Sequence, residues 1–401
     1  MKPFFLITIL FSLVYTQQTK KLSIEIINYE EREWWSKYNN NGLDFRDINS
    51  SFFYKNKINN YNINVVSHVS KDKIILAESF LSYDFPKNYK FKIGKYYRDF
   101  SSYLNDEISS GSMLVSLNSS PLPKAGLLGS YKLKKNKTIQ FNYGIAHAFL
   151  DKNDIYNKSP MVHEKFIYLI RKNKNSEFGF GLVHEAMWGG STDEYGKFPN
   201  SFKDFLKVVI SADGEKKEGQ PHANALGNHL GIWDFYFIKN YEKRKLKLYY
   251  QHFFEDTSGL RFANNLDGLW GVEYSNVSHN INLLFEYLNT SNQDRDPPYV
   301  DDAYYTHSEY RLGWSYKGYV IGNPFIDNIN YNPSKIVHIG LNSIESKRYK
   351  FKILFSKRID INDSIKYSLN FGKRFNNKII SLFINGEKTN NAGLNIIYEL
   401  K

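Results

Sequence analysis

The chain contains 401 residues with a net charge of +12, and it combines an aromatic content of 17% with a hydrophilic mean hydropathy of −0.51. Its apolar residues are scattered singly among Lys, Asn and Ser, unlike the apolar runs of a soluble α/β enzyme, and no arginine-rich tract or zinc-finger spacing points to nucleic acid. The positive charge is compatible with a polyanionic partner and equally with the codon usage of an AT-rich genome.

The N-terminus has the build of a secretory signal peptide. Met1-Lys2 supplies a basic start, an apolar run extends from Phe4 to Tyr15, and polar residues begin at Gln17. We therefore predict that residues 1–16 are a signal peptide. No other stretch approaches the ~20 apolar residues of a membrane-spanning helix, so a mature chain embedded in a membrane must cross it with strands.

Residues 17–60 show no sustained periodicity. The run from Glu30 to Trp35 has the composition of a short helix, and Asn39-Asn40-Asn41-Gly42 has that of a turn. We predict that this segment is a short periplasmic leader or plug segment.

From residue 61 the sequence alternates with a period of two. Typical segments have about ten residues, the length of a tilted strand that crosses a membrane, whereas strands of soluble sandwiches have five or six. Alternation continues to the last residues, so the final strand can pair with the first and remove the sheet edges. We predict an all-β fold, namely a transmembrane antiparallel β-barrel of about 18 strands over residues 61–401. Two of the alternating faces are Tyr349, Phe351, Ile353 and Phe355, and Leu394, Ile396, Tyr398 and Leu400.

Residues 188–227 interrupt this rhythm. Gly189-Gly190 and Pro199 precede a helical stretch over residues 201–209, in which Ser201 has the position of an N-cap and Asp204 the third helical position. The segment is too long for a periplasmic turn. We predict a helix-containing insert that is an external loop or narrows the lumen.

Polar and aromatic residues gather around this insert and in later loops. Glycan-binding sites stack aromatic faces on sugar rings and bond the sugar hydroxyls with carboxylates, amides and imidazoles. The clusters contain both the aromatic and the polar side chains that such a site needs. Two alternatives stay open: the tryptophans mark the lipid interface, and the polar residues form a network that holds the loops to the wall. The candidates for polysaccharide binding or loop ordering are His184, Trp188, Asn228, His229, Trp233, Asp234, Asp256, Trp270, Tyr305 and His307.

Other chemistry has little support. The histidines match no metal-ligand spacing, so neither a metal nor another cofactor is predicted. Adjacent carboxylates such as Glu255-Asp256 would point to opposite faces of a strand and could not straddle one glycosidic bond. A Gly-x-Ser-x-Gly nucleophile motif is also missing, and we predict that the protein is not an enzyme.

Ten short segments of the chain form an ordered set of polar, aromatic and glycine-containing motifs. They are Gly111–Ser116, Pro121–Lys124, His163 with Lys165, His184–Gly190, Asn224–Asp234, Phe254–Gly259, Asp267–Gly271, Tyr304–His307, Gly313-Trp314 and Gly322–Pro324. Taken in this order, the segments resemble the Wzi-like capsule assembly family. This resemblance implies an outer-membrane barrel of about 18 strands that acts as a lectin for capsular or exopolysaccharide and is not an enzyme.

We therefore expect a non-enzymatic protein of the bacterial outer membrane that binds surface polysaccharide and assists capsule or exopolysaccharide assembly and attachment. A porin-like channel for small solutes is the main alternative, and a surface hydrolase is a weaker one. The expected partners are the polysaccharide, outer-membrane lipids and lipopolysaccharide, and the barrel-assembly machinery, with no nucleic acid among them.

Overall fold

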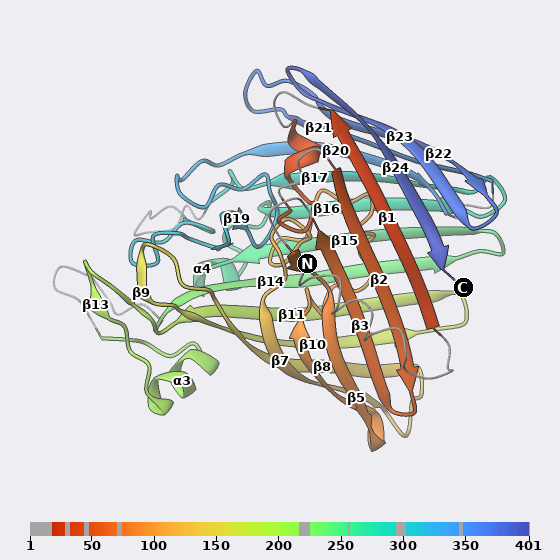
Figure 1. The fold of residues 1–401 in the computed structure, drawn as a ribbon. Helices are drawn as coiled ribbons and strands as arrows, with labels where there is room; N and C mark the ends of the chain where they lie inside the picture. Colours follow the sequence, from red (N-terminus) through yellow and green to blue (C-terminus); the bar gives the residue numbers. More distant parts are fainter. Residues whose placement is uncertain are drawn as a thin grey trace.

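The computed structural model describes residues 18–28, 33–43, 48–69, 74–215, 225–255, 257–293, 302–344 and 348–400. Within these ranges one antiparallel sheet closes on itself, because β1 (Gln18–Asn28) pairs with β2 (Ile48–Ile58) on one side and with β24 (Asn390–Leu400) on the other. The barrel has 18 strands when the short β4 and β5, which follow one another along β3, count as one interrupted strand. The predicted fold class is confirmed (Figure 1).

The remaining elements divide into wall strands and small elements in the connections. The wall strands are β3 (Tyr61–Val69), β4 (Ile74–Leu76), β5 (Ser79–Phe85), β6 (Tyr89–Lys95), β7 (Pro123–Lys132), β8 (Ile139–Phe149), β10 (Met161–Lys172), β11 (Ser176–Trp188), β14 (Asn228–Asn240), β15 (Arg244–Phe254), β16 (Gly268–Asn276), β17 (Ile281–Asn289), β20 (Lys335–Ser343), β21 (Tyr349–Arg358), β22 (Lys366–Phe375) and β23 (Lys378–Gly386). The connections contain α2 (Trp34–Lys37), the 3-10 helix η2 (Pro86–Asn88), β9 (Tyr156–Lys158), β12 (Ser191–Thr192), β13 (Gly196–Lys197), α3 (Phe202–Val209), α4 (Thr257–Leu260), β18 (Ser315–Tyr316) and β19 (Tyr319–Val320).

Alternation along the strands separates an apolar outer face from a packed inner face. Outward residues such as Ile167, Phe285 and Phe371 form an exposed apolar belt, as expected of a wall that faces lipid. On the inner face of β11, Gly179 makes room for a tyrosine, because a Cβ there would lie 2.0 Å from Cε1 of Tyr236. Among the described residues, no helix is long and apolar enough to cross a membrane.

The two ends of the barrel differ in the length of their connections. At one end the strands are joined by tight turns such as Asn59-Asn60 and Asn376-Asn377, where Asn59 and Asn376 adopt φ angles of 51° and 52° that asparagine tolerates better than most residues. At the other end lie the long connections with their small strands and helices (Figure 1). Outer-membrane barrels have short periplasmic turns and long extracellular loops, so the long connections are extracellular.

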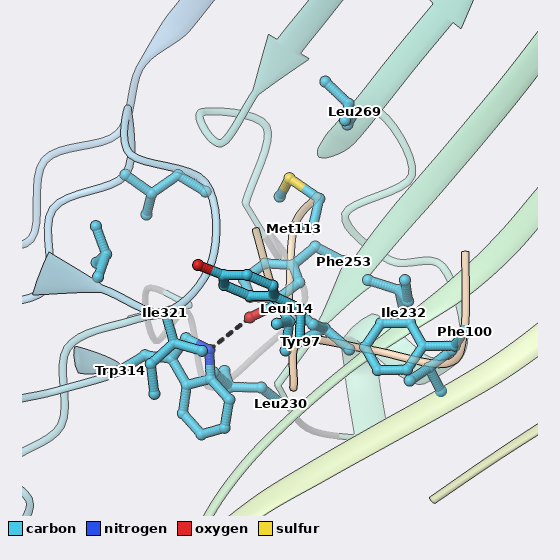
Figure 2. Close-up of a cluster of buried hydrophobic side chains, with 14 of the residues drawn as sticks. Tyr97, Phe100, Met113, Leu114, Leu230, Ile232, Phe253, Leu269, Trp314 and Ile321 are labelled. Atoms are coloured by element: carbon cyan, nitrogen blue, oxygen red, sulfur yellow. Dashed lines mark hydrogen bonds between the residues drawn. The ribbon is translucent and has the colours of Figure 1, made fainter. Parts of the chain in front are cut away.

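The lumen is filled by residues 33–43, 96–122 and 302–334, which we call the plug. Its segments are bonded to one another: the Trp314 indole N–H donates to the Leu114 carbonyl at 2.9 Å, and the Asn323 amide donates to the Gly111 carbonyl at 2.7 Å. Figure 2 shows Trp314 and Leu114 of the plug within a buried cluster that also includes Ile232 of β14 and Phe253 of β15. The plug and the inner wall therefore share one hydrophobic core.

The predicted boundary between leader and barrel is corrected by the structure. We expected the wall to begin at residue 61, but β1 and β2 both belong to it, and Leu22, Ile24 and Ile26 already alternate along β1. Of the described residues between β1 and β2, residues 33–43 form plug, and they enter at the extracellular end, where Asn41 N–H donates to the Leu117 carbonyl at 2.7 Å. The predicted signal peptide, residues 1–16, lies outside the described residues and stays a prediction.

The insert contains the helix that its sequence predicted. Ser201 caps α3, since its hydroxyl accepts a hydrogen bond from the Asp204 N–H and the Asp204 carboxylate accepts one from the Ser201 N–H. The helix does not narrow the lumen, because Phe205 packs against outward residues of the wall. Its aromatic contacts are His147, His163 and Trp188.

Candidate functional site

The ten candidates from the sequence are divided among several environments. Residues directly opposite one another on neighbouring strands share a face of the sheet. Ile167, half exposed in the apolar belt, is paired with Leu182, which is paired with Trp233, so Trp233 points outward. By the same pairing, four candidates point outward, namely His184, Trp188, His229 and Trp270, whereas Asn228 and Asp234 point inward. Tyr305 and His307 both lie in plug segment 302–334. Asp256 lies outside the described residues.

Asp234 connects the wall to the plug. Its fully buried carboxylate accepts hydrogen bonds from the hydroxyls of Ser101, at 2.6 Å, Tyr103 and Tyr168. Ser101 also accepts a bond from the Gln251 amide at 3.0 Å. Asp234 therefore holds plug segment 96–122 against the wall. Such loop ordering was the alternative to ligand contact that the sequence left open.

A second inward carboxylate repeats this arrangement. Glu286 of β17 accepts hydrogen bonds from the Ser109 hydroxyl at 2.7 Å and from the Ser110 N–H at 2.6 Å.

A buried ion pair lies on the inner face of another part of the wall. The Lys124 ammonium of β7 lies 2.6 Å from the Glu164 carboxylate of β10, and both side chains are almost fully buried. The space beside that pair has a volume of about 10 Å³, which holds no more than about one water molecule. This part of the interior has no room for a sugar.

Tyr305 and Asn228 are also buried away from solvent. The Tyr305 hydroxyl donates to the Met113 carbonyl and accepts from the Asn323 N–H at 2.9 Å, so it holds two plug segments together. The Asn228 side chain is 1% exposed, and its amide atoms find no partner among the described residues. Neither residue is accessible to a polysaccharide in this structure.

His184 and His229 lie together on the outer wall beneath α3. Their ring nitrogens are 2.8 Å apart, and the Ser211 hydroxyl lies 3.2 Å from the His184 ring. Trp188 is covered by Phe205 of α3, with ring centroids 5.4 Å apart. Within the described ranges, no group of three or more His, Cys, Asp or Glu residues could hold a metal ion.

Trp233 and Trp270 lie on the outer face near the extracellular end of the wall. Trp233 stacks on Phe180 with ring centroids 5.3 Å apart, and its indole N–H donates to the Leu260 carbonyl at 3.1 Å. Trp270 stacks on Tyr250 with centroids 3.6 Å apart. Aromatic side chains of this kind are typical of the membrane–water interface. Trp270 differs from Trp233 because it also lines a groove.

We call this depression the rim groove, and its volume is about 430 Å³. It lies where β16, β17 and β20 meet the extracellular loops. Trp270 and its cross-strand neighbour Tyr287 form the aromatic part, and the loop that follows β17 supplies amides and a hydroxyl. The lining residues are Leu266, Trp270, Tyr287, Asn289, Ser291, Asn292 and Lys335.

The polar side of the rim groove is held in place from below by Asp267. Its carboxylate accepts hydrogen bonds from the N–H groups of Asn292 at 2.7 Å and Gln293 at 3.0 Å, and from the Tyr304 hydroxyl at 2.5 Å. Burial raises the pKa of Asp267 above its ordinary value, and these hydrogen bonds act in the opposite direction. Asp267 therefore fixes the loop that carries Asn292 without facing a ligand itself.

Lys335 is the charged member of the rim groove. Its backbone N–H donates to Asp360 at 3.0 Å, but no carboxylate of the described residues forms an ion pair with its ammonium group. Asn289, which is paired with Lys335 across the strands, accepts hydrogen bonds from the Ser291 N–H and hydroxyl. Within the part of the chain that the structure describes, the groove thus places an ammonium group without an ion-pair partner beside ordered amides.

Trp270 was predicted from the sequence as a candidate site residue, but the other residues that line the rim groove were not. Tyr287 becomes part of the site only through strand pairing, which the sequence does not specify. The run Asn289-Thr290-Ser291-Asn292 directly after an alternating segment was the available signal.

A second aromatic group, which lies in the plug, was also not predicted from the sequence. Trp34 stacks on Phe325 with ring centroids 4.5 Å apart and contacts Tyr38 at 4.3 Å, while Tyr38 contacts Tyr319 at 6.4 Å. All four are half-buried. They come from plug segments 33–43 and 302–334, so only the folded plug brings them together.

The family model described as capsule assembly protein Wzi matches residues 10–329, well over half of the chain. The chain belongs to the Wzi capsule assembly family. The resemblance inferred from the ordered clusters is therefore confirmed. Together with the exposed apolar belt, membership places the protein in the bacterial outer membrane, as predicted.

The chain is similar to several solved structures. Wzi of Escherichia coli, described as a carbohydrate-binding β-barrel of the outer membrane involved in group 1 capsule assembly, is 13% identical, with a TM-score of 0.60 over 95% of this chain and 84% of that chain. OccK5 (OpdH) of Pseudomonas aeruginosa is 9% identical, with a TM-score of 0.43 over 96% and 97% of the chains. A mutant Rhodopseudomonas blastica porin is 8% identical, with a TM-score of 0.41 over 96% and 98% of the chains. No curated protein matches the chain in sequence.

Proposed function

We propose that this Wzi-family barrel binds surface polysaccharide in the rim groove and thereby helps to hold capsule or exopolysaccharide at the outer membrane. The observation that carries the proposal is the composition of the groove: two aromatic rings, amides, a hydroxyl and an ammonium group around about 430 Å³. Sites for small ligands commonly have volumes of ~300–1,000 Å³. The groove lies at the rim of the lipid-facing wall, beside the headgroups of the outer leaflet.

The proposed binding divides between stacking and hydrogen bonding. One face of Trp270 lies on Tyr250, so the opposite face is left for the C–H groups of a sugar ring. Asn292 and Ser291 are positioned to bond sugar hydroxyls, because the Asp267 and Asn289 contacts order their loop. Lys335 would pair with a carboxylate or phosphate on the glycan, which favours an acidic polysaccharide.

The porin-like alternative is disfavoured by the filled lumen. Plug residues contact the wall on several sides, through Asp234, Glu286 and His338, whose ring bonds the Ile108 carbonyl at 2.7 Å. We expect no stable conductance steps when the protein is inserted into planar bilayers. A reproducible open step in symmetric salt would favour the channel instead.

The test of the proposal uses the full-length mature protein in vesicles and polysaccharide purified from the surface of the producing cells. Saturable binding is expected, and the glycan recovered afterwards should have an unchanged chain length and no new reducing ends. Absence of binding would refute the proposal. Appearance of shortened products would favour the hydrolase instead.

A further inference from the structure

The helix α3 lies against the outside of the barrel at its extracellular rim. Phe205 contacts three outward side chains, with ring centroids 5.4–5.6 Å away. Val208 is fully buried against the same surface, and the Lys165 ammonium donates to the Val209 carbonyl at the end of the helix. The position of α3 on the wall is therefore fixed by packing and by a hydrogen bond.

Only part of the apolar surface of α3 is used in this packing. At about 100° per residue, its apolar residues form one broad stripe, and Lys203 and Lys207 lie together beside it. The wall covers Phe205 and Val208, while Phe202, Leu206 and Ile210 remain 74%, 48% and 74% exposed. These three residues recur every fourth position and so form one uncovered apolar edge.

This uncovered edge lies next to the lipid-facing belt. The wall residues beneath α3 include His147 of β8 and His163 of β10. Toward the periplasmic end of the same two strands, the exposed belt residues Ile145 and Ile167 lie two residues from His147 and four residues from His163. At about 3.3 Å per residue, the belt begins roughly 7–13 Å below the helix. Lys165 also faces outward between His163 and Ile167, and its ammonium group bonds α3. The uncovered edge of α3 therefore lies close to the surface that contacts the membrane.

We propose that α3 is an interfacial helix that lies in the outer leaflet. Phe202, Leu206 and Ile210 enter between the acyl chains, and Lys203 and Lys207 face the anionic phosphates of the lipid headgroups. Amphipathic helices with lysines beside an apolar face bind membranes in this orientation. The capping box of Ser201 and Asp204 keeps the helix formed at this position. The insert thus fixes the depth of the barrel rim in the membrane.

Because the chain contains no cysteine, single labels can be introduced without background. Spin labels at Leu206→Cys and Ile210→Cys should be accessible to oxygen and shielded from a water-soluble nickel chelate, in vesicles of phosphatidylcholine with lipid A. Ile167→Cys in the apolar belt serves as the lipid reference. Lys197→Cys on the exposed β12–β13 hairpin of the same insert serves as the water reference.

The proposal predicts an oxygen-to-nickel accessibility ratio for residues 206 and 210 that is several-fold above that of residue 197 and close to that of residue 167. A ratio equal to that of residue 197 would overturn it, since the edge would then face water. Exclusion of both reagents would also overturn it, because a second protein copy would then cover the edge. Dilution with excess unlabelled protein identifies such self-association, since it removes spin–spin broadening. All labelled residues are exposed, so the barrel itself stays intact.

Discussion

At the scale of single residues, the carboxylates inside the barrel hold the plug and those at the rim shape the groove. Asp234 illustrates the first role, since it accepts hydrogen bonds from two tyrosines and one serine in a site without solvent. Asp267 illustrates the second, because it bonds the backbone of the loop that lines the groove. Both carboxylates therefore have structural roles in this protein.

Replacing Asp234 by alanine should loosen the plug. The hydroxyls of Ser101, Tyr103 and Tyr168 would stay buried without their acceptor, and each such group costs ~1–3 kcal/mol. We expect Asp234→Ala to lower the free energy of unfolding by about 3 kcal/mol and to produce fluctuating conductance in planar bilayers. Asp154→Ala, the same truncation on an exposed loop, should change neither. Silent bilayers and unchanged stability for Asp234→Ala would show that this carboxylate does not hold the plug.

Lys335 provides a test of the charge preference of the groove. Lys335→Gln keeps the length and hydrogen-bonding capacity of the side chain but removes its charge. Binding of an acidic polysaccharide should weaken about two- to fivefold, because a partly exposed ion pair contributes ~0.5–1 kcal/mol. Binding of a glycan stripped of its carboxylates or phosphates should not change. An equal loss for both glycans would show that Lys335 supports the groove sterically, without pairing with the glycan.

At the scale of elements, the sequence predicted a barrel of about 18 strands and the insert helix. The wall strands from β3 onward alternate because one face meets lipid and the other meets the plug, so their pattern survives in the sequence. The helix α3 was predictable from the Ser201-x-x-Asp204 spacing, which is a local signal. β1 and β2 were missed because Lys20-Lys21 and the irregular segment between the two strands obscured their alternation.

The cap of α3 should make the helix sensitive to acid. Hydrogen bonds from Ser201 lower the pKa of Asp204 below its ordinary value of 3.8. A lowered pKa means that ionised Asp204 stabilises the helix above the unfolded-state pKa, and this contribution is lost as the pH falls through the lowered value. Amide hydrogen exchange of α3 should therefore be faster at pH 3 than at pH 7, after correction for the intrinsic rate.

The same measurement on Ser201→Ala provides the control. Loss of the N-cap costs about 1 kcal/mol, so α3 should exchange faster at pH 7. The difference between the two pH values should also shrink, because the hydroxyl that lowers the Asp204 pKa is gone. Identical exchange in both proteins at both pH values would show that the capping box does not stabilise α3.

At the scale of the whole molecule, the barrel is a closed wall around a packed core. Its 18 strands could have enclosed a channel, but residues 33–43, 96–122 and 302–334 fill the lumen and join its hydrophobic core. The closed lumen leaves the extracellular rim as the surface where a long polymer can be held. There the rim groove and α3 lie on different parts of the wall.

The division between wall and plug explains why the site was only partly predictable. Alternation shows that His184 and Trp188 share a face with Phe178 and Phe180, but it does not say which face meets lipid. The inner face carries Gly179 and Gly181, which admit tyrosine rings from neighbouring strands. Contacts between such distant segments exist only after closure, so the sequence could suggest Trp270 but not Tyr287 or Lys335 beside it.

The affinity of two matched tryptophan variants for the native surface polysaccharide is the sharpest test of glycan binding in the rim groove. Trp270 and Trp233 both lie outward near the extracellular rim, but only Trp270 lines the groove. Trp270→Ala should weaken binding about tenfold, equivalent to ~1.4 kcal/mol, and Trp233→Ala should leave it unchanged. Equal losses would favour the wider site suggested by the sequence. Full retention of affinity in Trp270→Ala would contradict glycan binding in the rim groove.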